Sequence, residues 1–362
     1  MTRNADPLRF AYWVPSTSRE VVIRDYDRGT IWDIDDNITL ARAAEAAGFD
    51  YALTQIRFAA GRGVESQHES VAFSHALLAA TEKLRVIAAI LPGPWKPALA
   101  AKQIATINHL TRGRIALNVV SGWYRGEFDA IGEPWPDLAE RHERAEEFVR
   151  ALRGIWTEDA FSFAGKHYRF DAYRMQPKPL DPQPEIFQGG TSSAARDTAA
   201  RVADWYFTNG NSPQGLAAQT ADLREKATGH DRRVRTGVNA FVIARDTEEQ
   251  ARAVLDSIAA TADPEALDDL PGADGRITRT PEENWSDSTL RDLVRYKDGF
   301  RSNLIGTPDQ IADRILALKD AGADMLLLSF LNPLPELEYF RRHVLPVIRR
   351  KEATRASRAT AA

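Results

Sequence analysis

The sequence predicts an α/β protein whose fold class is a (β/α)8 TIM barrel with insertion loops. Short apolar runs alternate with longer amphipathic runs along nearly the whole chain, and about eight such pairs can be counted. The run at residues 84–91 is almost uninterrupted by polar residues, which is typical of a parallel strand buried on both faces. The chain length of 362 residues fits one barrel enlarged by insertions.

Strands are expected where an apolar run is short and is bounded by turn residues. The expected strands lie at residues 8–14, 51–56, 84–91, 113–120, 184–188, 204–208, 237–244 and 325–330. Helices are expected where apolar residues recur on one helical face. They lie at residues 38–47, 70–80, 97–110, 139–156, from 194 onward, 214–228, 248–260 and 339–349. Gly48 follows the first helix and Pro97 begins the third, as these residues commonly do at helix ends.

Residues 1–350 are expected to form a single domain that two longer segments interrupt. Residues 155–182 contain a possible hairpin at 161–170, and residues 262–301 are polar and rich in Asp, Pro and Gly. Loops of this length in a compact domain are often functional, so we expect residues 262–301 to act as a lid. The Ala- and Arg-rich residues 351–362 are expected to form a flexible tail.

Composition excludes several classes of function. A formal net charge of -4 favours neither nucleic acid nor an anionic membrane as a partner. The sequence has no cysteine, which excludes disulfides, zinc–thiolate sites, iron–sulfur clusters and thiol nucleophiles. The N-terminal residues carry no apolar leader, and no apolar run is long enough to span a membrane, so we expect a cytoplasmic protein.

Residues 184–197 combine a short apolar strand, a glycine pair and a helix start rich in hydroxyl groups. Gly189 and Gly190 allow close approach of a ligand to the backbone, and Thr191 and Ser192 precede free N–H groups at a helix N-terminus. Phosphate groups bind at such positions in α/β barrels. An ordinary capped turn explains the same pattern, and on the pattern alone that interpretation is favoured.

The strand ends, where barrel enzymes place their sites, carry aromatic rings and amides. They include no evident paired carboxylate, metal-binding cluster or Ser–His–Asp arrangement, so no metal is expected. An apolar pocket with a few amides suits a planar cofactor with its own reactivity, which favours a flavin over hydrolysis. We expect His68 and His75 to be structural or at the surface. The spacing around His142 favours a solvated, charged helix face.

Several motifs together resemble the luciferase-like flavin monooxygenases. They lie at residues 10–13 (FAYW), 55–58 (QIRF), 67–71 (QHESV), 87–95 (IAAILPGPW), 118–123 (NVVSGW), 187–192 (FQGGTS), 205–210 (WYFTNG) and 303–308 (NLIGTP). The resemblance covers about residues 8–347. Within the family it is greatest to the branch of FMN-dependent dimethyl sulfone monooxygenases, for which the motifs at residues 91–95 and 205–210 are fairly specific.

The resemblance implies a two-component enzyme. A separate NAD(P)H-dependent reductase would supply reduced FMN, and this chain would use it with O2 to oxidise dimethyl sulfone to methanesulfinate and formaldehyde. The family also implies a homo-oligomer, either a dimer or a tetramer. Two alternatives stay open: a short-chain alkanesulfonate monooxygenase acting on methanesulfonate, and a barrel that binds a phosphorylated metabolite without flavin.

The resemblance also assigns residues to a cofactor site. Gly190, Thr191 and Ser192 would meet the FMN phosphate, which now becomes the favoured interpretation of that loop. The other expected cofactor residues are Gln55, Ala89, Ile90, Asn118, Ser121 and His142. Of these, Ala89 and Ile90 would support the ring face. His142 stands where relatives usually place a Tyr.

The expected substrate pocket consists of strand-end aromatic residues, amides and one lysine. It is formed by Trp13, Gln67, Trp95, Asn239, Phe241, Lys297 and Phe330. Alkanesulfonate enzymes place cationic and protic groups at most of these positions, whereas this chain has amides and aromatic rings. Because a buried sulfonate needs fixed cations, the change favours a neutral sulfone, although Lys297 and Arg301 remain as possible cations. Trp13, Trp95, Phe241 and Phe330 could instead be simple core residues.

Overall fold

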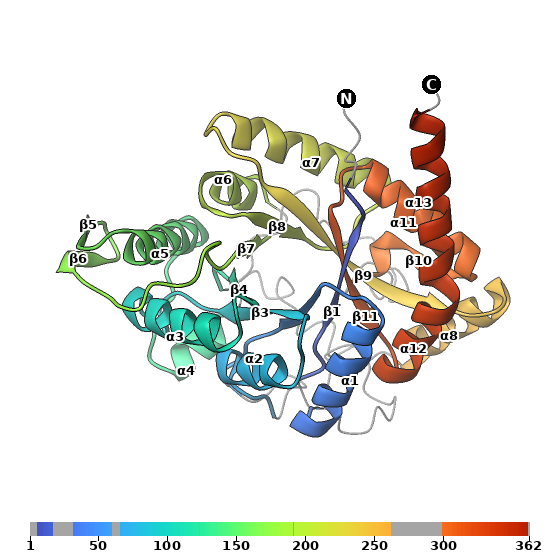
Figure 1. Ribbon diagram of the computed structural model, residues 1–362, viewed down its shortest axis with the longest axis horizontal. Coiled ribbons are helices and arrows are strands. Elements are labelled where there is room, and N and C mark those ends of the chain that lie inside the picture. The colour runs from blue at the N-terminus through green and yellow to red at the C-terminus, as the bar shows by residue number, and fades with distance from the viewer. Residues whose placement is uncertain are drawn as a thin grey trace.

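Eight parallel strands close into a barrel, as the sequence predicts (Figure 1). The computed structural model describes residues 6–16, 32–59, 66–122, 124–190, 192–261 and 299–360. The barrel strands are β1 (Arg9–Trp13), β2 (Tyr51–Thr54), β3 (Arg85–Ile90), β4 (Ile115–Val119), β7 (Ile186–Gly189), β8 (Trp205–Thr208), β9 (Arg235–Ala244) and β11 (Met325–Phe330). Their order is β11-β1-β2-β3-β4-β7-β8-β9, and β9 also pairs with β11, which closes the ring.

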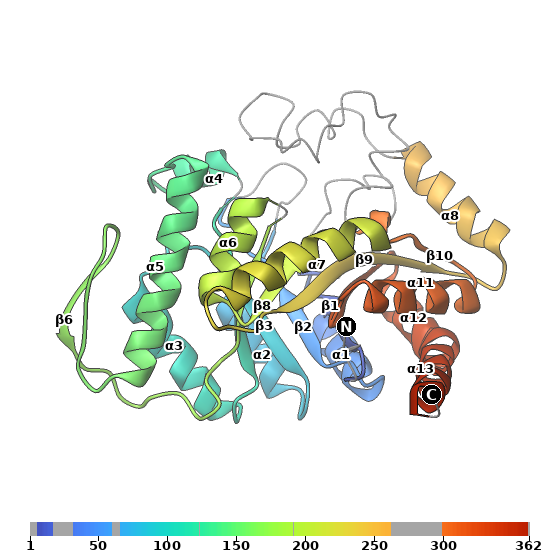
Figure 2. The ribbon, with the colours of Figure 1, turned by 90° about the horizontal axis from the view of Figure 1, so that it is seen from above.

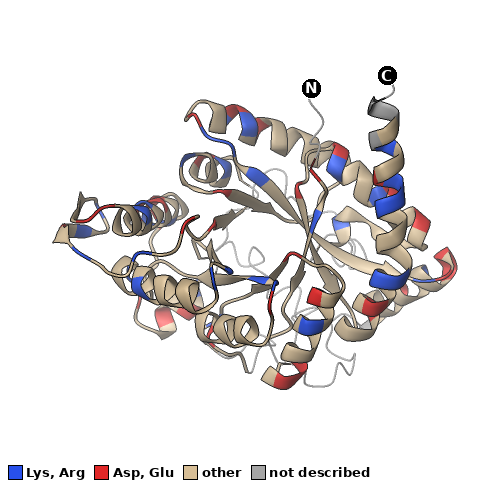
Figure 3. Cartoon of the chain, in the orientation of Figure 1, with Lys and Arg blue, Asp and Glu red and all other residues tan. Residues whose placement is uncertain are grey.

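Helices surround the barrel, and Lys, Arg, Asp and Glu lie mainly on these helices (Figures 1 and 3). They are α1 (Ile34–Ala46), α2 (Ser70–Ala79), α3 (Pro97–Leu110), α4 (Arg125–Ala130), α5 (Leu138–Thr157), α6 (Ser193–Val202), α7 (Pro213–Thr228), α8 (Glu248–Thr261), α11 (Pro308–Asp320), α12 (Pro333–Tyr339) and α13 (Leu345–Thr360). Short side chains cap several of them: the Asp33 carboxylate accepts the N–H of Asp36, and Asp137 accepts that of Glu140.

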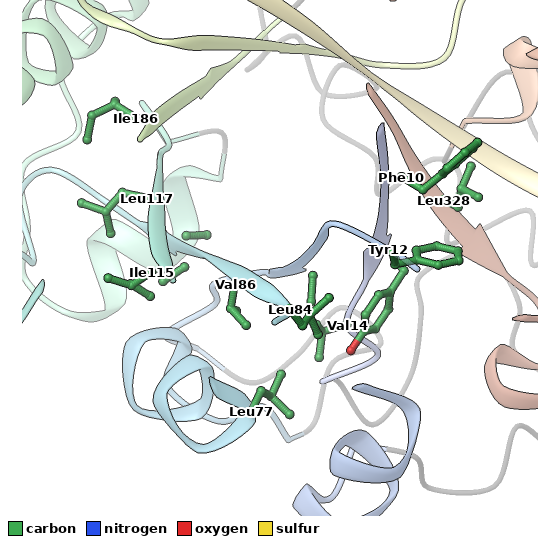
Figure 4. Close-up of a cluster of buried hydrophobic side chains, with 14 of the residues drawn as sticks. Phe10, Tyr12, Val14, Leu77, Leu84, Val86, Ile115, Leu117, Ile186 and Leu328 are labelled. Atoms are coloured by element: carbon green, nitrogen blue, oxygen red, sulfur yellow. The ribbon is translucent and has the colours of Figure 1, made fainter. Parts of the chain in front are cut away.

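Side chains of the strands alternate between two apolar layers. Ala11, Leu53 and Ile87 belong to a cluster that fills the barrel. Phe10, Tyr12 and Leu328 belong to the layer between the barrel and the helices, part of which Figure 4 shows. Because both faces of each strand are buried, the strands read as continuous apolar runs rather than as alternating ones.

Two elements near the C-terminal end of the barrel were not predicted. Strand β10 (Leu304–Gly306) pairs with the last residues of β9, and helix α11 follows it. Thr307 begins this helix with a capping box: its hydroxyl accepts the N–H of Gln310, and the Gln310 side chain accepts the N–H of Thr307. The pattern Thr-Pro-x-Gln was therefore a readable start signal that the prediction overlooked.

The insertions have different outcomes. Strands β5 (Phe161–Ala164) and β6 (Arg169–Tyr173) form an antiparallel hairpin, which confirms that prediction. The hairpin lies beside α5, on the side away from the barrel (Figures 1 and 2). Most of the expected lid, residues 262–298, lies outside the described residues.

Most of the expected tail is helical in the structure. Residues 351–360 continue helix α13. Lys351 contacts the Asp313 carboxylate at 2.7 Å, and Arg355 contacts that of Asp320 at 2.8 Å. An Ala- and Arg-rich segment has high helix propensity, and here it also finds acidic partners on α11.

The N-terminal strand is held by residues near the other end of the chain. Arg9 of β1 pairs with Met325 of β11. Just before β1, the N–H of Leu8 donates to the Glu352 carboxylate at 3.3 Å, and the carbonyl of Leu8 accepts a hydrogen bond from Arg349 at 3.2 Å. Closure of the barrel therefore depends on contacts between residues more than 300 positions apart.

A single carboxylate joins the N-terminal ends of several barrel strands. Glu185 Oε1 accepts hydrogen bonds from Trp205 Nε1 at 3.0 Å and from Arg235 at 2.5 Å. Its Oε2 accepts from the Tyr51 hydroxyl at 2.7 Å and lies 2.7 Å from Arg85 Nη1. These partners come from β2, β3, β8 and β9. Burial raises the pKa of Glu185, but Arg85, Tyr51, Trp205 and Arg235 together lower it below its ordinary value of 4.5.

The first prediction concerns Glu185→Gln. The variant leaves two arginines at the barrel base without a counter-charge, so we expect the free energy of unfolding at pH 7 to fall by about 2 kcal/mol. Because folding lowers the pKa of Glu185, its contribution is present above pH 4.5 and is lost as pH falls through the folded-state pKa. Urea unfolding at a series of pH values should show the difference between wild type and variant shrinking on acidification.

Glu143→Gln serves as the control, because Glu143 is paired with Lys166 at the exposed surface of α5. Its effect on unfolding should be close to zero. Equal effects of the two substitutions would show that Glu185 does not organise the barrel base.

Candidate active site

The loop between β7 and α6 is held tightly to β8. The N–H of Gly190 donates to the carbonyl of Phe207 at 3.1 Å, and the carbonyl of Gly190 accepts the Tyr206 hydroxyl at 2.5 Å. Gly190 has a φ of +151°, and a Cβ added there would lie 2.5 Å from the Cβ of Ala195. Only glycine therefore fits this position, as the sequence suggested. Gly189 differs, because a Cβ there would make ordinary contacts of 3.6–3.7 Å.

The N-terminus of α6 follows this loop directly. Ser192 is the N-cap residue, and its hydroxyl accepts the N–H of Ala195 at 3.2 Å. The N–H groups of Ser193 and Ala194 belong to the first turn, which has no intrahelical acceptor for them. This helix start therefore offers hydrogen-bond donors and a positive dipole end to an anion. Thr191 lies outside the described residues.

A chain of polar side chains supports the loop from behind. The Tyr206 hydroxyl that donates to Gly190 also interacts with Arg196, and Arg196 forms a close ion pair with Asp222. Lys226 adds a contact of 2.6 Å to the Ser193 hydroxyl. Burial raises the pKa of Asp222, but Arg196 and Lys226 lower it below its ordinary value, so the carboxylate stays charged. The motif at residues 205–210 does not by itself indicate this role for Tyr206.

The side chains of His142 and Ser121 lie together. The Ser121 hydroxyl lies 3.2 Å from His142 Nδ1. His142 is only 9% exposed, so the interpretation of its position as a solvated helix face was wrong. His142 lies on the buried face of α5, together with Ala145 and Val149. Burial, together with the nearby Arg141 and Arg201, lowers the pKa of His142, which favours a neutral imidazole.

Several strands carry amides or an indole in or just after their C-terminal halves. Trp13 Nε1 donates to Asn239 Oδ1 at 2.9 Å, although β1 and β9 are separated by β11. Gln67 Nε2 donates to the carbonyl of Gln55 at 2.9 Å. Within the described residues, the buried oxygens Gln67 Oε1 and Asn118 Oδ1 have no hydrogen-bond donor. Two unsatisfied acceptors and a fixed indole are what a polar, planar ligand requires at the edge of a barrel.

Some expected pocket residues are placed elsewhere. Phe330 faces the outer layer, where its ring lies 6.0 Å from that of Phe340, because Met325 and Leu327 occupy the inward positions of β11. The pocket assignment of Phe330 is therefore corrected to core packing. Ile90 likewise belongs to the outer layer and does not support a ring inside the barrel.

Three of the remaining candidate residues are buried, and a fourth lies outside the described residues. Phe241 is fully buried and stacks on Phe300, with ring centroids 4.4 Å apart. Trp95 is buried beside the partly exposed Phe58 at the end of β2, with centroids 5.1 Å apart. Ala89 is buried, and its carbonyl accepts the Ser70 hydroxyl at 2.5 Å. Lys297 lies outside the described residues.

An ion pair at the end of β2 was missed by the sequence analysis. Arg57 lies 3.4 Å from the Glu127 carboxylate, and both side chains are buried. Glu127 also accepts the N–H groups of Phe58 and Ala59, which fixes the chain after β2. The sequence could not reveal this pair. Glu127 lies in α4, a short helix without a clear apolar pattern, and it reaches Arg57 only through the tertiary fold.

Comparison with known proteins establishes the family. Residues 9–325 match the family model of the luciferase-like monooxygenases, and the chain belongs to this family. It is 61% identical over 356 residues to a protein of Pseudomonas putida named FMNH2-dependent dimethylsulfone monooxygenase, covering 97% of this chain and 98% of the relative. A protein of the same name from Pseudomonas fluorescens (strain Pf0-1) is 61% identical over 357 residues, covering 98% of each chain.

Solved structures with low sequence identity share the fold. Riboflavin lyase RcaE, crystallised with modified FMN and riboflavin, has a TM-score of 0.81 at 21% identity, covering 96% of this chain and 92% of that one. DmoA from Hyphomicrobium sulfonivorans has a TM-score of 0.79 at 20% identity, covering 96% and 89%. These similarities confirm the (β/α)8 barrel.

Among the described residues, no group of three or more His, Asp and Glu side chains is arranged to hold a metal ion. In the same ranges, every helix is too short or too polar to cross a membrane.

The second prediction compares the two glycines of the β7–α6 loop. Gly190→Ala forces a methyl group into Ala195 and strains the backbone, so it should lower the free energy of unfolding by about 1–3 kcal/mol. Gly189→Ala has room for its methyl group and should change stability little. Thermal and urea unfolding of both variants check this, and equal losses would contradict the special geometry of Gly190.

Proposed function

We propose that this protein is a reduced-FMN-dependent monooxygenase that oxidises dimethyl sulfone. The observation that carries the proposal is 61% identity, over nearly the whole chain, to two relatives that bear this name. The balanced reaction is dimethyl sulfone, O2 and reduced FMN going to methanesulfinate, formaldehyde, oxidised FMN and water. One C–S bond breaks, and the reduced flavin supplies two electrons and two protons.

The β7–α6 loop fits a flavin phosphate. The N–H groups of Ser193 and Ala194 are free of intrahelical bonds, and the absence of a side chain at Gly190 leaves space at the helix start. Ser192 contributes less than the sequence suggested, because its hydroxyl caps the helix. His142 of α5, with Ser121 just after β4, offers further polar contacts.

The strand ends fit the flavin ring. Asn118 Oδ1 and Gln67 Oε1 are buried acceptors without donors in the described part of the chain. A flavin ring carries N–H groups, which would satisfy acceptors of this kind. Gln55 contributes through its backbone. Its carbonyl accepts a hydrogen bond from Gln67 Nε2, so that Gln67 Oε1 points away from Gln55.

The described residues at the barrel mouth suit a neutral substrate. Trp13, Asn239 and Gln67 carry no charge, and Arg57 is neutralised by Glu127. Beside Trp13, Asn239 and Gln67 a sulfonate would lose its hydration without gaining a cation from these residues, whereas a sulfone needs only hydrogen-bond donors and apolar walls. This charge pattern favours dimethyl sulfone over methanesulfonate.

The chain's own contribution to the reaction is binding, orientation and exclusion of water. Reduced flavin, when bound, supplies the electrons that activate O2. Trp13, Phe58 and Trp95 provide aromatic surface at the strand ends, which limits entry of water to the reacting groups. Among the described candidates, the amides of Asn239 and Gln67 orient groups rather than transfer protons.

The proposal includes partners and location. Because the two relatives at 61% identity are named FMNH2-dependent, we infer that the flavin reaches this chain already reduced, from a separate NAD(P)H-dependent reductase. We also propose a homo-oligomer, a dimer or a tetramer as in the family, and a cytoplasmic location.

The third prediction tests the substrate directly. Purified protein, supplied with an FMN reductase, NADH and O2, should convert dimethyl sulfone to methanesulfinate and formaldehyde in equal amounts. In a mixture with methanesulfonate, dimethyl sulfone should be consumed at least about tenfold faster, because the sulfonate pays an uncompensated desolvation cost. Preferential consumption of methanesulfonate would favour the alternative function, and failure to bind reduced FMN would exclude both.

The fourth prediction concerns the support of the phosphate loop. Tyr206→Phe removes the hydrogen bond to the Gly190 carbonyl and should weaken reduced-FMN binding about tenfold, on the order of 1 kcal/mol. Riboflavin lacks the phosphate, so its affinity should stay unchanged. Anaerobic absorbance titrations with both flavins give the comparison.

Tyr12→Phe is the matched control. Tyr12 is also a fully buried strand residue, but its hydroxyl has no partner among the described residues. Its removal should leave both affinities unchanged. If Tyr206→Phe weakened riboflavin as much as FMN, Tyr206 would act on the whole site and not on the phosphate loop.

A further inference from the structure

The hydrogen bond between Trp13 and Asn239 determines which way the Asn239 amide points. An indole N–H can only donate, so the atom that faces it at 2.9 Å must be the oxygen Oδ1. The amide nitrogen Nδ2 then points away from Trp13. This contact removes the usual ambiguity between the two ends of an asparagine amide.

Both residues lie at the mouth of the barrel and face its interior. Trp13 packs against the interior cluster. Gly237 also faces the interior, because a Cβ added there would meet the ring of Phe207, and Asn239 lies two residues further along the same strand. Asn239 pairs in register with Leu327, another interior residue. Successive residues alternate across a strand, so Asn239 points inward above this layer.

The backbone of Asn239 is also fixed. Its carbonyl accepts the Ser302 hydroxyl at 3.0 Å, in the short helix η2 (Phe300–Ser302) that packs on β9. Nδ2 has no hydrogen-bond acceptor in the described ranges, although Asn239 is only partly exposed. The result is a held amide that presents two N–H donors at the barrel mouth.

Gln67 shows the opposite arrangement. Its Nε2 donates to a backbone carbonyl, which can only accept, so Gln67 presents an oxygen. Among the described residues, the site therefore holds one amide whose donor has no partner and one whose acceptor has none. A sulfone has two strongly polar oxygens and no donor, so only the first amide can bind it by a hydrogen bond.

We propose that Asn239 determines specificity by donating its side-chain N–H to a sulfone oxygen, and that Trp13 is the positioning residue that keeps the amide in this orientation. The inference rests on the proposed function. Without the indole N–H, the Asn239 amide can rotate and present its oxygen, which repels a sulfone oxygen. Trp13 thus acts through Asn239 as well as by its aromatic surface.

The test separates the indole N–H from the ring. Trp13→Phe keeps an aromatic ring, so KM for dimethyl sulfone should rise about tenfold, with a smaller change in kcat and an unchanged affinity for reduced FMN. Asn239→Asp keeps an acceptor for Trp13 but loses the donor, and it should raise KM at least as much. In the double variant the two effects should not add, because each removes the same donor.

Trp156→Phe is the matched control. Trp156 Nε1 donates to the carbonyl of Ala101 at 3.2 Å between α5 and α3, away from the strand ends of β1 and β9. This variant also loses an indole N–H hydrogen bond, at a tryptophan that is more deeply buried than Trp13, and it should keep the wild-type KM. Thermal unfolding of all variants shows whether they are folded under assay conditions.

The outcomes are distinguishable. Wild-type protein that does not turn over dimethyl sulfone overturns the proposed function and this inference with it. Wild-type turnover with an unchanged KM in Trp13→Phe overturns the positioning role alone. An unchanged KM in Asn239→Asp, which remains folded and binds FMN, overturns the donor role. Additive effects in the double variant show that Trp13 and Asn239 act separately.

Discussion

The Glu185 carboxylate sets the geometry on which the rest of the barrel depends. It lies at the base of the barrel and joins side chains of β2, β3, β8 and β9, while its own carbonyl accepts the N–H of Leu117 next to β7. A polar group inside a barrel is costly unless all its hydrogen-bonding positions are used, and here both oxygens have two partners. The register of these strands at the base also fixes where their C-terminal ends lie along the barrel axis.

Closure brings together residues that no local pattern relates. Trp13 and Asn239 are 226 positions apart and lie on strands that are not neighbours, yet the inward alternation of both strands lets their side chains meet. The same alternation takes Phe330 to the outer layer. Which residues line the barrel mouth therefore depends on the alternation of side chains along each strand. A residue one position along the strand points to the outer layer instead of the barrel interior.

The fold could be predicted well from the sequence, because each strand is a short apolar run and most helix starts carry a cap or a proline. The special backbone at Gly190 could also be predicted, since a glycine pair ends the strand there. The assignment of Phe330 to the pocket was wrong. A strand buried on both faces has no alternation of apolar and polar residues, so the sequence does not show which side chains point into the barrel. Arg57, Glu127 and the Tyr206 support could not be predicted, because their partners are fixed only by tertiary contacts.

The pairing of β1 with β11 has a consequence for how the molecule is made. A ribosome releases the strands in order, and β1 can pair with β2 early, but its other edge has no partner until residues 325–330 have emerged. Helix α13, which holds Leu8 through Glu352 and Arg349, follows later still. During synthesis the growing sheet therefore keeps an open edge until β11 emerges, and an open strand edge is a site at which chains can associate.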